Sequence, residues 1–269
     1  MNKSYLKYAG GKSRILEEVL ATFPDNIKVF AEPFVGSCTV ALNVEAKEKM
    51  LNDYNVDLIE THRIAYHYST ELIDHLEKLY PHGRDIYYTV RDGFNEGKLT
   101  TRQKAAAFIY MNKHGFNGMS RYNKKGKFNV PVGKGNSIHF PKEELLNFRT
   151  NLNSDVVFLH GDFEHFCNMV PDNSVVYCDP PYVPKSATLS DINYTGEAFT
   201  WADQCRLRAC ILCLQSRGCH VVVSNHDLPI TRDLYKDADE IRSVQAFRSI
   251  SSKDNRGQVA ELLAVYLPK

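Results

Sequence analysis

Buried-strand patterns alternate with helical patterns in the two outer parts of the chain. Apolar runs rich in β-branched and aromatic residues predict strands at 28–34, 50–53, 155–163, 174–178 and 220–227. Apolar residues at helical spacing predict helices that begin at Ser13 and at Thr39. A third helix is expected to begin at Thr200, because Thr200 and Asp203 have the spacing of a capping box.

The order strand, glycine turn, helix, strand near the amino terminus is that of a nucleotide-binding βαβ unit. Residues 239–247 and 258–267 predict an antiparallel pair at the sheet edge. The fold class is therefore α/β, with a Rossmann-like, mostly parallel sheet and an antiparallel edge hairpin. From 56 to 146 the pattern changes to polar helices and one short β-hairpin. We expect one domain from 1–55 and 147–269, and an inserted helical domain at 56–146.

Composition indicates an ordinary globular protein. The chain has 269 residues, enough for a sizeable core, and no apolar run long enough to cross a membrane. It has seven cysteines and no apolar leader at its amino terminus, which favours reduced thiols over a disulfide framework. We therefore expect a cytoplasmic protein.

Positive charge is concentrated in the insertion, although the net charge is only +1. Residues 97–142 contain ten lysines and arginines and no acid, which leaves 23 basic and 32 acidic residues in the remainder, a net charge of −9. Such a segment is typical of a polyanion-binding surface. A solvated lysine-rich face is the alternative on composition alone.

A stiff turn, Asp-Pro-Pro-Tyr, ends the strand at 174–178. Prolines cannot continue a strand ladder, and each fixes its own φ, so Asp179, Pro180 and Tyr182 are held in nearly fixed positions. An aromatic amine becomes a better nucleophile when both N–H groups donate to fixed acceptors. The Asp179 carboxylate and the Pro180 carbonyl are candidate acceptors, and Tyr182 is a candidate stacking partner. A proline-stiffened turn with a packing tyrosine is the alternative.

Two further motifs suggest a cofactor site. Phe-Val-Gly-Ser-Cys, 34–38, is a glycine turn, and Asp53 ends the next strand at a spacing typical of ribose recognition. Asp53 as a cap or turn residue is the alternative. Residues 7–13 end in Gly-Lys-Ser, but the P-loop glycine is replaced by Leu6 and no strand precedes it. A turn that caps the first helix is the alternative there.

Two other patterns favour structural roles. Cys205, Cys210 and Cys213 have iron–sulfur spacing but lie in a helical run, so we expect buried core cysteines and no metal site. Ser224 and His226, with the neighbouring Asp227, are adjacent in sequence, which is not how nucleophilic triads are built, so we expect a local turn network.

The motifs together resemble the Dam-type DNA adenine-N6 methyltransferases. The motifs KYAGGK, AEPFVG, the Asp53 strand end, FNGMSRYNKKGKFNVP, GDF, DPPY and SNHD occur in that family's order and span nearly the whole chain. The resemblance implies a methyltransferase sheet, S-adenosylmethionine as methyl donor, no metal, and double-stranded DNA as substrate. The family's usual target, GATC, is the expected site, with the adenine flipped out of the duplex.

The resemblance also assigns site residues. Catalysis is assigned to Asp179, Pro180, Pro181 and Tyr182. The methionine and ribose parts of the cofactor, which Asp179 also borders, are assigned to Tyr8, Ala9, Gly10, Gly11, Lys12, Glu32, Pro33, Phe34, Gly36 and Asp53. Its adenine is assigned to Asp162 and Phe163.

DNA recognition is assigned to the insertion. Phe116 is expected to wedge into the duplex, Asn117 to lie near the orphaned base, and Arg121 to read a guanine. Met119 and Pro131 are expected to contact a thymine methyl group. The other assigned DNA contacts, with the lysines at phosphates, are Gly118, Asn123, Lys124, Lys125, Lys127, Lys134 and Ser186.

One residue departs from the family pattern. Cys38 stands where the cofactor turn commonly has its second glycine, so weaker cofactor binding remains an alternative, although loss of activity is not expected.

The loop 183–199 is long enough to be a lid. Two alternatives remain: the same chemistry on RNA or a protein amide, and a DNA-binding protein without turnover. A monomer or weak dimer is expected, and pairing with a restriction enzyme is open.

Overall fold

The computed structural model describes residues 1–8, 10–134, 138–184, 199–247 and 258–269. The predicted contacts of Ala9 and Ser186 and most of the predicted lid therefore lie outside the described residues. The chain divides into two compact units. The helical unit contains Met1–Gly11, Gly36–Asn43 and Asn55–Asn153, and the sheet unit contains Lys12–Val35, Val44–Tyr54 and Ser154–Lys269. The helical unit thus includes two amino-terminal stretches that lie outside 56–146, and the predicted functional division stays a prediction.

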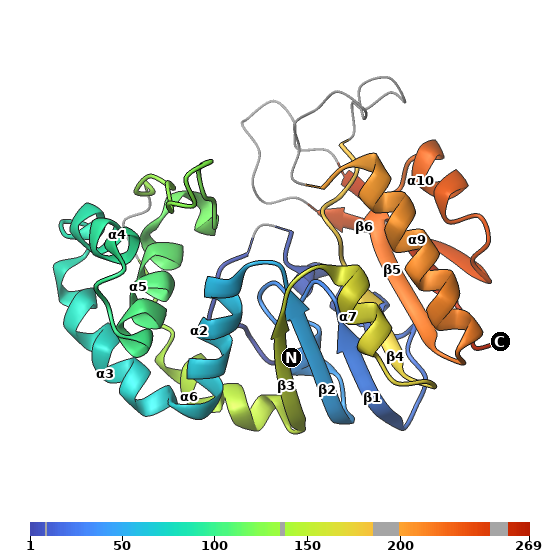
Figure 1. The fold of residues 1–269 in the computed structure, drawn as a ribbon, viewed down its shortest axis with the longest axis horizontal. Helices are drawn as coiled ribbons and strands as arrows, with labels where there is room; N and C mark the ends of the chain where they lie inside the picture. Colours follow the sequence, from blue (N-terminus) through green and yellow to red (C-terminus); the bar gives the residue numbers. More distant parts are fainter. Residues whose placement is uncertain (9, 135–137, 185–198, 248–257) are drawn as a thin grey trace. The chain divides into compact units, whose positions relative to one another are not determined.

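A seven-stranded sheet of order β3-β2-β1-β4-β5-β7-β6 forms the sheet unit (Figure 1). Its strands are β1 (Ile27–Glu32), β2 (Ala46–Asp53), β3 (Asp155–His160), β4 (Val175–Cys178), β5 (His220–His226), β6 (Glu240–Phe247) and β7 (Gln258–Tyr266). The first five are parallel, whereas β7 is antiparallel to both β5 and β6. The α/β class and the antiparallel tail are therefore confirmed. Since β1 lies between β2 and β4, the strand order reverses there, which is where such sheets bind ligands.

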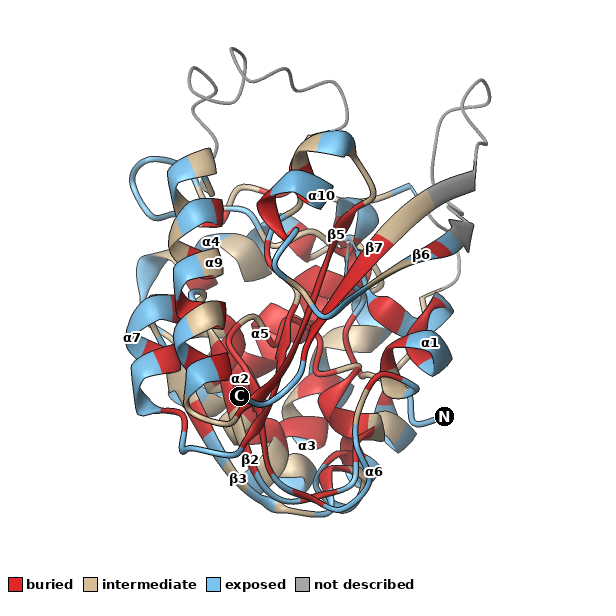
Figure 2. Ribbon diagram, turned by 90° about the vertical axis from the view of Figure 1, so that its right-hand side faces the viewer, coloured by how far each residue is buried: buried red, intermediate tan, exposed pale blue. Residues whose placement is uncertain are grey.

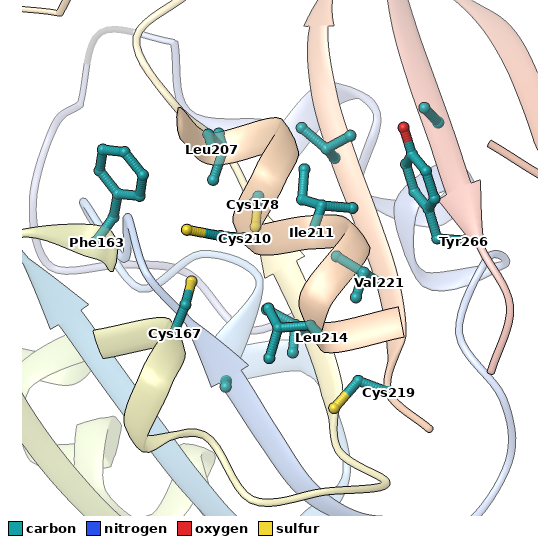
Figure 3. Close-up of a cluster of buried hydrophobic side chains, with 14 of the residues drawn as sticks. Phe163, Cys167, Cys178, Leu207, Cys210, Ile211, Leu214, Cys219, Val221 and Tyr266 are labelled. Atoms are coloured by element: carbon teal, nitrogen blue, oxygen red, sulfur yellow. The ribbon is translucent and has the colours of Figure 1, made fainter. Parts of the chain in front are cut away.

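Alternation along the strands gives the sheet unit two apolar faces. The helices of this unit are η1 (Lys12–Arg14), α1 (Leu16–Leu20), α7 (Phe163–Met169), α9 (Trp201–Ser216) and α10 (Pro229–Leu234). Cys178 of β4 and Val221 of β5 pack with Leu214 of α9 in one core (Figure 3). Tyr177 points the other way, and its ring meets that of Phe23 at 6.0 Å. Both faces are covered, so β4 and β5 are buried throughout (Figure 2).

The capping box that begins α9 is confirmed. The Thr200 hydroxyl accepts from the Asp203 N–H at 3.3 Å, and the Thr200 N–H donates to Asp203 Oδ2 at 2.8 Å. The expectation of buried cysteines on this helix is only partly right. Cys210 is buried, but Cys205 and Cys213 are exposed, because the helix buries one stripe and the three cysteines do not share it.

Two helices differ from the sequence expectation. The helix expected from Thr39 is wrong: this stretch forms only the 3₁₀ turn η2 (Ala41–Asn43). The physical reason is that β2 begins at Ala46, earlier than the expected strand start at Met50, which leaves too few residues for an α-helix. The helix expected from Ser13 is shorter than its apolar pattern, because η1 precedes it and α1 begins only at Leu16.

Helices dominate the helical unit, as predicted for the insertion. Beside η2 they are α2 (Val56–His67), α3 (Ser69–Leu79), η3 (Tyr80–His82), α4 (Tyr87–Glu96), α5 (Thr101–His114), η4 (Phe116–Gly118) and α6 (Lys142–Leu152). The central helix is α5, which packs against α2, α3 and α4 and is buried from Ala105 to His114. The expected hairpin is present as an antiparallel bridge between Tyr122 and Phe128, with the Asn123 N–H donating to the Lys127 carbonyl at 2.9 Å.

A fully buried histidine ties α2 to the amino-terminal segments of the helical unit. His62 Nε2 lies 2.8 Å from the Gly36 carbonyl, and Nδ1 lies 2.5 Å from the Tyr5 hydroxyl. The neutral ring satisfies both contacts, since Nε2–H donates to the carbonyl and Nδ1 accepts from the hydroxyl. Burial lowers the pKa of His62 to about 4, against the opposing effect of the hydrogen bond that His62 donates to the Gly36 carbonyl.

We predict that His62 makes the protein acid-sensitive. Because the folded-state pKa lies below the unfolded one, the unfolded chain binds the extra proton, so stability is lost as the pH falls from about 6.5 towards 4. The loss amounts to roughly 2 kcal/mol between pH 6.5 and 5. Urea unfolding of His62→Gln, which keeps a donor and an acceptor, is expected to lack this part of the pH dependence. Exposed His82→Gln is the control, and an unchanged pH dependence in His62→Gln contradicts the assignment.

Candidate functional site

Asp179 directly follows β4, as the sequence predicts, and its carboxylate is held by two side chains. Lys12 Nζ lies 2.8 Å from Asp179 Oδ1, with side-chain exposures of 5% and 23% for the two residues. The Ser224 hydroxyl donates to the same oxygen at 3.0 Å. Among the described residues, both partners approach Oδ1, so the geometry leaves Oδ2 as the oxygen to be presented to a substrate.

The interaction of Ser224 corrects the expected turn network. Ser224 and His226 both lie within β5, not in a turn. Local contacts remain at Asp227, whose Oδ1 lies 2.6 Å from Arg232 Nε, and at the His226 carbonyl, which accepts from the Thr231 hydroxyl at 2.6 Å. The Tyr177 hydroxyl lies 2.9 Å from Ser224 Oγ, so a buried chain of hydroxyls leads from Tyr177 to the carboxylate. Parallel pairing of β4 with β5 produces this chain, which sequence adjacency did not reveal.

Side chains from α9 and β5 fix the backbone of the proline turn. Gln204 Nε2 donates to the Pro181 carbonyl at 2.8 Å. The Val183 N–H donates to Asn225 Oδ1 at 3.1 Å, and Nδ1 of His226 donates to the Val183 carbonyl at 2.7 Å. The stiffness that the prolines predict is therefore reinforced from outside the turn.

Tyr182 has partners at its hydroxyl, its edge and its face. The hydroxyl donates to Glu261 Oε2 at 2.7 Å, and the ring meets His226 edge-on with centroids 4.9 Å apart. Lys12 Nζ lies 4.8 Å from the ring centroid. Burial, reinforced by the charge of Asp179, raises the pKa of Tyr182 well above its usual value, so this phenol remains a donor. The sequence analysis missed Glu261; its signal is a single acid in the apolar strand β7.

Two acids predicted to bind the cofactor lie at the carboxyl ends of neighbouring strands in the sheet unit. Glu32 ends β1 and is 2% exposed, and Asp53 ends β2 and is half-buried. Between them, Asn52 Nδ2 donates to the Pro33 carbonyl at 2.9 Å and to the Gly161 carbonyl at 3.1 Å. Gly161 has φ of +142° and open space where a Cβ would lie, so the backbone is approachable at this edge of the sheet.

The residues predicted for an adenine ring form an aromatic and charged cluster. Phe163 is buried and its ring lies 5.4 Å from that of Phe34. Asp162 caps α7 by accepting from the Glu164 N–H at 2.9 Å, and its Oδ1 also accepts from Arg206 Nη2 at 2.7 Å. The Arg206 guanidinium carbon lies 4.8 Å from the Phe163 ring centroid. Arg206 was not foreseen, because nothing in its local sequence distinguishes it from a solvated helix residue.

Lys12 is paired with Asp179, the predicted catalytic acid, an interaction that the sequence analysis did not foresee. The other residues predicted for the amino-terminal cofactor turn, Tyr8, Gly10, Gly11 and Gly36, belong to the helical unit. Tyr8 packs on Gly36: a Cβ on that glycine, whose φ is +48°, would lie 2.9 Å from Tyr8 Cε1. A larger residue at Gly36 therefore requires the Tyr8 ring to move.

Cys38 keeps the backbone of the glycine that it replaces. Its φ is +61°, in the left-handed region, and its side chain is fully buried. A left-handed non-glycine residue costs roughly 1–2 kcal/mol. The left-handed φ shows that the turn keeps its backbone conformation without a glycine. The effect of the thiol on cofactor affinity stays a prediction.

The predicted DNA-contacting side chains are mostly exposed on the helical unit. Phe116 in η4 is 44% exposed, and Asn117 beside it is exposed with φ of +54°. The others that are exposed are Arg121, Asn123, Lys124, Lys125, Lys127, Pro131 and Lys134. Met119 is half-buried and Gly118 is buried. An exposed phenylalanine in a stretch of sequence that is rich in cations and lacks acids is unusual on a solvated face.

Polar side chains of the helical unit hold the hairpin and η4, and sequence reasoning missed them; Asn112 is buried, whereas Asn95 and Asp57 are half-buried. Asn95 makes two hydrogen bonds to the backbone of Phe128, at 2.8 Å to its N–H and 3.0 Å to its carbonyl. The Tyr122 hydroxyl donates to Asp57 Oδ2 at 2.7 Å. Asn112 Nδ2 donates to the Gly118 carbonyl at 2.9 Å. These contacts attach the hairpin and η4 to α4, α2 and α5.

Asn123 and Arg121 of the hairpin make different kinds of contact: Asn123 bonds to the backbone of the turn, and Arg121 bonds to a side chain. Asn123 Oδ1 accepts from the N–H groups of Lys125 and Lys127, at 2.9 and 3.1 Å, so Asn123 builds the turn. Arg121 Nε donates to Asn129 Oδ1 at 2.9 Å. That contact engages only one of the guanidinium nitrogens, and the two terminal nitrogens are the pair that recognises a guanine edge.

Neither a metal centre nor a membrane span is found in the described parts of the chain. The described residues contain no group of three or more His, Cys, Asp or Glu side chains placed to hold an ion. No helix within them is both long and apolar enough to cross a bilayer.

The mostly parallel sheet, with the acid–proline turn beside the point where its strand order reverses, places the chain in the class of open α/β folds, which bind their ligands at such a point. Comparison with known proteins narrows the class. The model of the D12 class N6 adenine-specific DNA methyltransferases matches residues 8–250. The chain is 36% identical over 271 residues to a DNA adenine methylase of Escherichia coli strain K12, covering 99% of this chain and 96% of that protein. It is 35% identical over 271 residues to a DNA adenine methylase of Vibrio cholerae serotype O1, with the same coverage.

The chain belongs to the D12 class of N6 adenine-specific DNA methyltransferases. The predicted family and the Rossmann-like methyltransferase fold are therefore confirmed, and adenine-specific DNA methylation is the activity of its class. Among solved structures, the rRNA methyltransferase aviRa of Streptomyces viridochromogenes aligns over 99% of this chain and 91% of that chain. With a TM-score of 0.43 and 11% identity, that likeness is too weak to carry an argument.

Proposed function

We propose that this protein transfers a methyl group from S-adenosylmethionine to N6 of an adenine flipped out of a GATC site in duplex DNA. The observation that carries the proposal is the orientation of Asp179, whose Oδ1 is engaged by Lys12 and Ser224 at 2.8 and 3.0 Å. An engaged Oδ1 leaves Oδ2 to accept one N–H of the adenine amine.

The second acceptor for the amine is the carbonyl of Pro180. Two fixed acceptors favour a tetrahedral nitrogen, whose lone pair then points away from the ring and towards an electrophile. Lys12 Nζ, 2.8 Å from Oδ1, offsets the negative charge of Asp179 in a site where the Asp179 side chain is only 23% exposed. Asp179 is then available to hold the proton that N6 releases when its new bond to carbon forms.

The acidic and aromatic side chains at the sheet edge suit the groups of S-adenosylmethionine. When bound, this cofactor supplies a sulfonium-activated methyl group. The acids Glu32 and Asp53, 2% exposed and half-buried, suit the ammonium and ribose hydroxyl groups, and the open space at Gly161 admits a ligand near them. Phe163 and Asp162 suit a purine through their ring and carboxylate. Asp162 also serves Arg206, so it accepts from two sides in this assignment.

DNA readout is assigned to η4 and the hairpin. Phe116 fills the gap left by the flipped adenine, an interpretation supported by its exposed fraction of 44%. Arg121 reads a guanine, supported by the engagement of Nε with Asn129. The exposed lysines of the insertion contact phosphates and add affinity without specifying sequence.

Methyl transfer is the direct test of the proposed function. Labelled methyl is expected to pass from S-adenosylmethionine to a GATC duplex, and not to the same duplex with N6-methyladenine in both strands, because no acceptor amine remains unmodified. Duplexes with one base changed are expected to be much poorer substrates. Transfer to RNA or protein but not to DNA, or no transfer at all, contradicts the proposal.

Arg121 and Lys124 make a matched pair for specificity. Arg121→Ala is expected to relax discrimination at one guanine by about 1–3 kcal/mol, roughly 5- to 150-fold in relative kcat/KM. Lys124→Ala removes an equally exposed cation and is expected to weaken all duplexes alike, with a smaller salt dependence. The measurement is kcat/KM on GATC and on its single-base variants. Unchanged preference in Arg121→Ala refutes the assignment of Arg121.

A further inference from the structure

Glu261 is a charged residue in the middle of the otherwise apolar strand β7. It lies opposite His226 in the antiparallel pair of β5 and β7, next to the buried residues Leu262 and Leu263. Its side chain is 18% exposed. A carboxylate in such a position loses much of its hydration, so it persists only where partners compensate.

The partners of Glu261 are two residues of the candidate catalytic site. Its Oε2 accepts from the Tyr182 hydroxyl at 2.7 Å and lies 3.8 Å from Lys12 Nζ. The Lys12 ammonium therefore lies between two carboxylates, Asp179 and Glu261, and beside the Tyr182 ring. These contacts form one cluster of two acids, one base and a phenol.

This cluster restrains the plane of the Tyr182 ring. A hydrogen bond at the hydroxyl and the edge contact with His226 at 4.9 Å hold the ring at two separate points. A ring held only by packing at its base can still rotate or tilt. Stacking on a base depends on that plane, since an aligned near-attack geometry is lost with small displacements.

We propose that Glu261 is a positioning residue for methyl transfer, which holds the Tyr182 ring as a fixed stacking platform for the target base and keeps Lys12 between Tyr182 and Asp179. The proposal rests on the proposed function. It assigns to β7, the antiparallel strand at the far end of the chain, a part in aligning the substrate.

Steady-state methylation by the 269-residue protein tests this role with four variants and one control variant. Glu261→Met, which removes the acceptor, is expected to lower kcat at least tenfold while the KM values for duplex DNA and S-adenosylmethionine stay within about twofold. Glu261→Gln keeps a neutral acceptor and is expected to recover most of the lost kcat. Tyr182→Phe is expected to match Glu261→Met, and the double variant to be no worse than either, because both remove one interaction. Glu48→Met, an exposed acid on β2, is the control.

A duplex with 2-aminopurine in place of the target adenine gives a spectroscopic readout. Stacking quenches this base, so Glu261→Met and Tyr182→Phe are expected to leave the flipped base brighter than the unaltered protein does. If Glu261→Met does not fold, Tyr182→Phe, which removes the same hydrogen bond from the other side, carries the comparison, with Glu261→Gln as the variant that keeps the bond.

Three results overturn the inference: additive losses in the Glu261→Met and Tyr182→Phe cycle, a rise in KM without a fall in kcat, or unchanged 2-aminopurine emission. Absence of methyl transfer by the unaltered protein instead refutes the proposed function, so the two failures are distinguishable.

Discussion

The buried ion pair between Lys12 and Asp179 is the interaction on which the site depends. The two atoms are 2.8 Å apart, and Lys12 is only 5% exposed. Removing one partner from such a pair leaves an uncompensated charge and typically costs about 3–5 kcal/mol. The pair joins η1 near the amino terminus to the end of β4, two segments of the sheet unit that are far apart in the sequence.

In both compact units, polar side chains fix the elements that were predicted to act on the substrate. In the sheet unit, the proline turn receives support from β5, β7 and α9 through Ser224, Asn225, Glu261 and Gln204, so its acceptors are preorganised before a substrate binds. In the helical unit, Asn95 and Asp57 attach the hairpin to a buried helical core. In each unit the exposed or reactive side chain is presented by polar side chains that sequence patterns do not mark.

Local chemistry made parts of the fold predictable. The strands that end at Cys178 and His226 are apolar runs, and the Thr200–Asp203 capping box is complete within four residues. The helix expected from Thr39 failed because tertiary pairing of β2 begins at Ala46 and overrides helical spacing. The family motifs indicated Asp179, but the atom that it presents is set by Lys12 and Ser224, which are 167 and 45 positions away and only meet in the folded sheet.

A crystal structure of the protein with S-adenosylhomocysteine and a GATC duplex tests the central claim most directly. The orientation of Asp179 predicts that the flipped adenine N6 lies about 3 Å from Asp179 Oδ2 and from the Pro180 carbonyl, while Lys12 and Ser224 keep Oδ1. An adenine amine facing Oδ1, or Lys12 displaced from Asp179 to another partner, contradicts it.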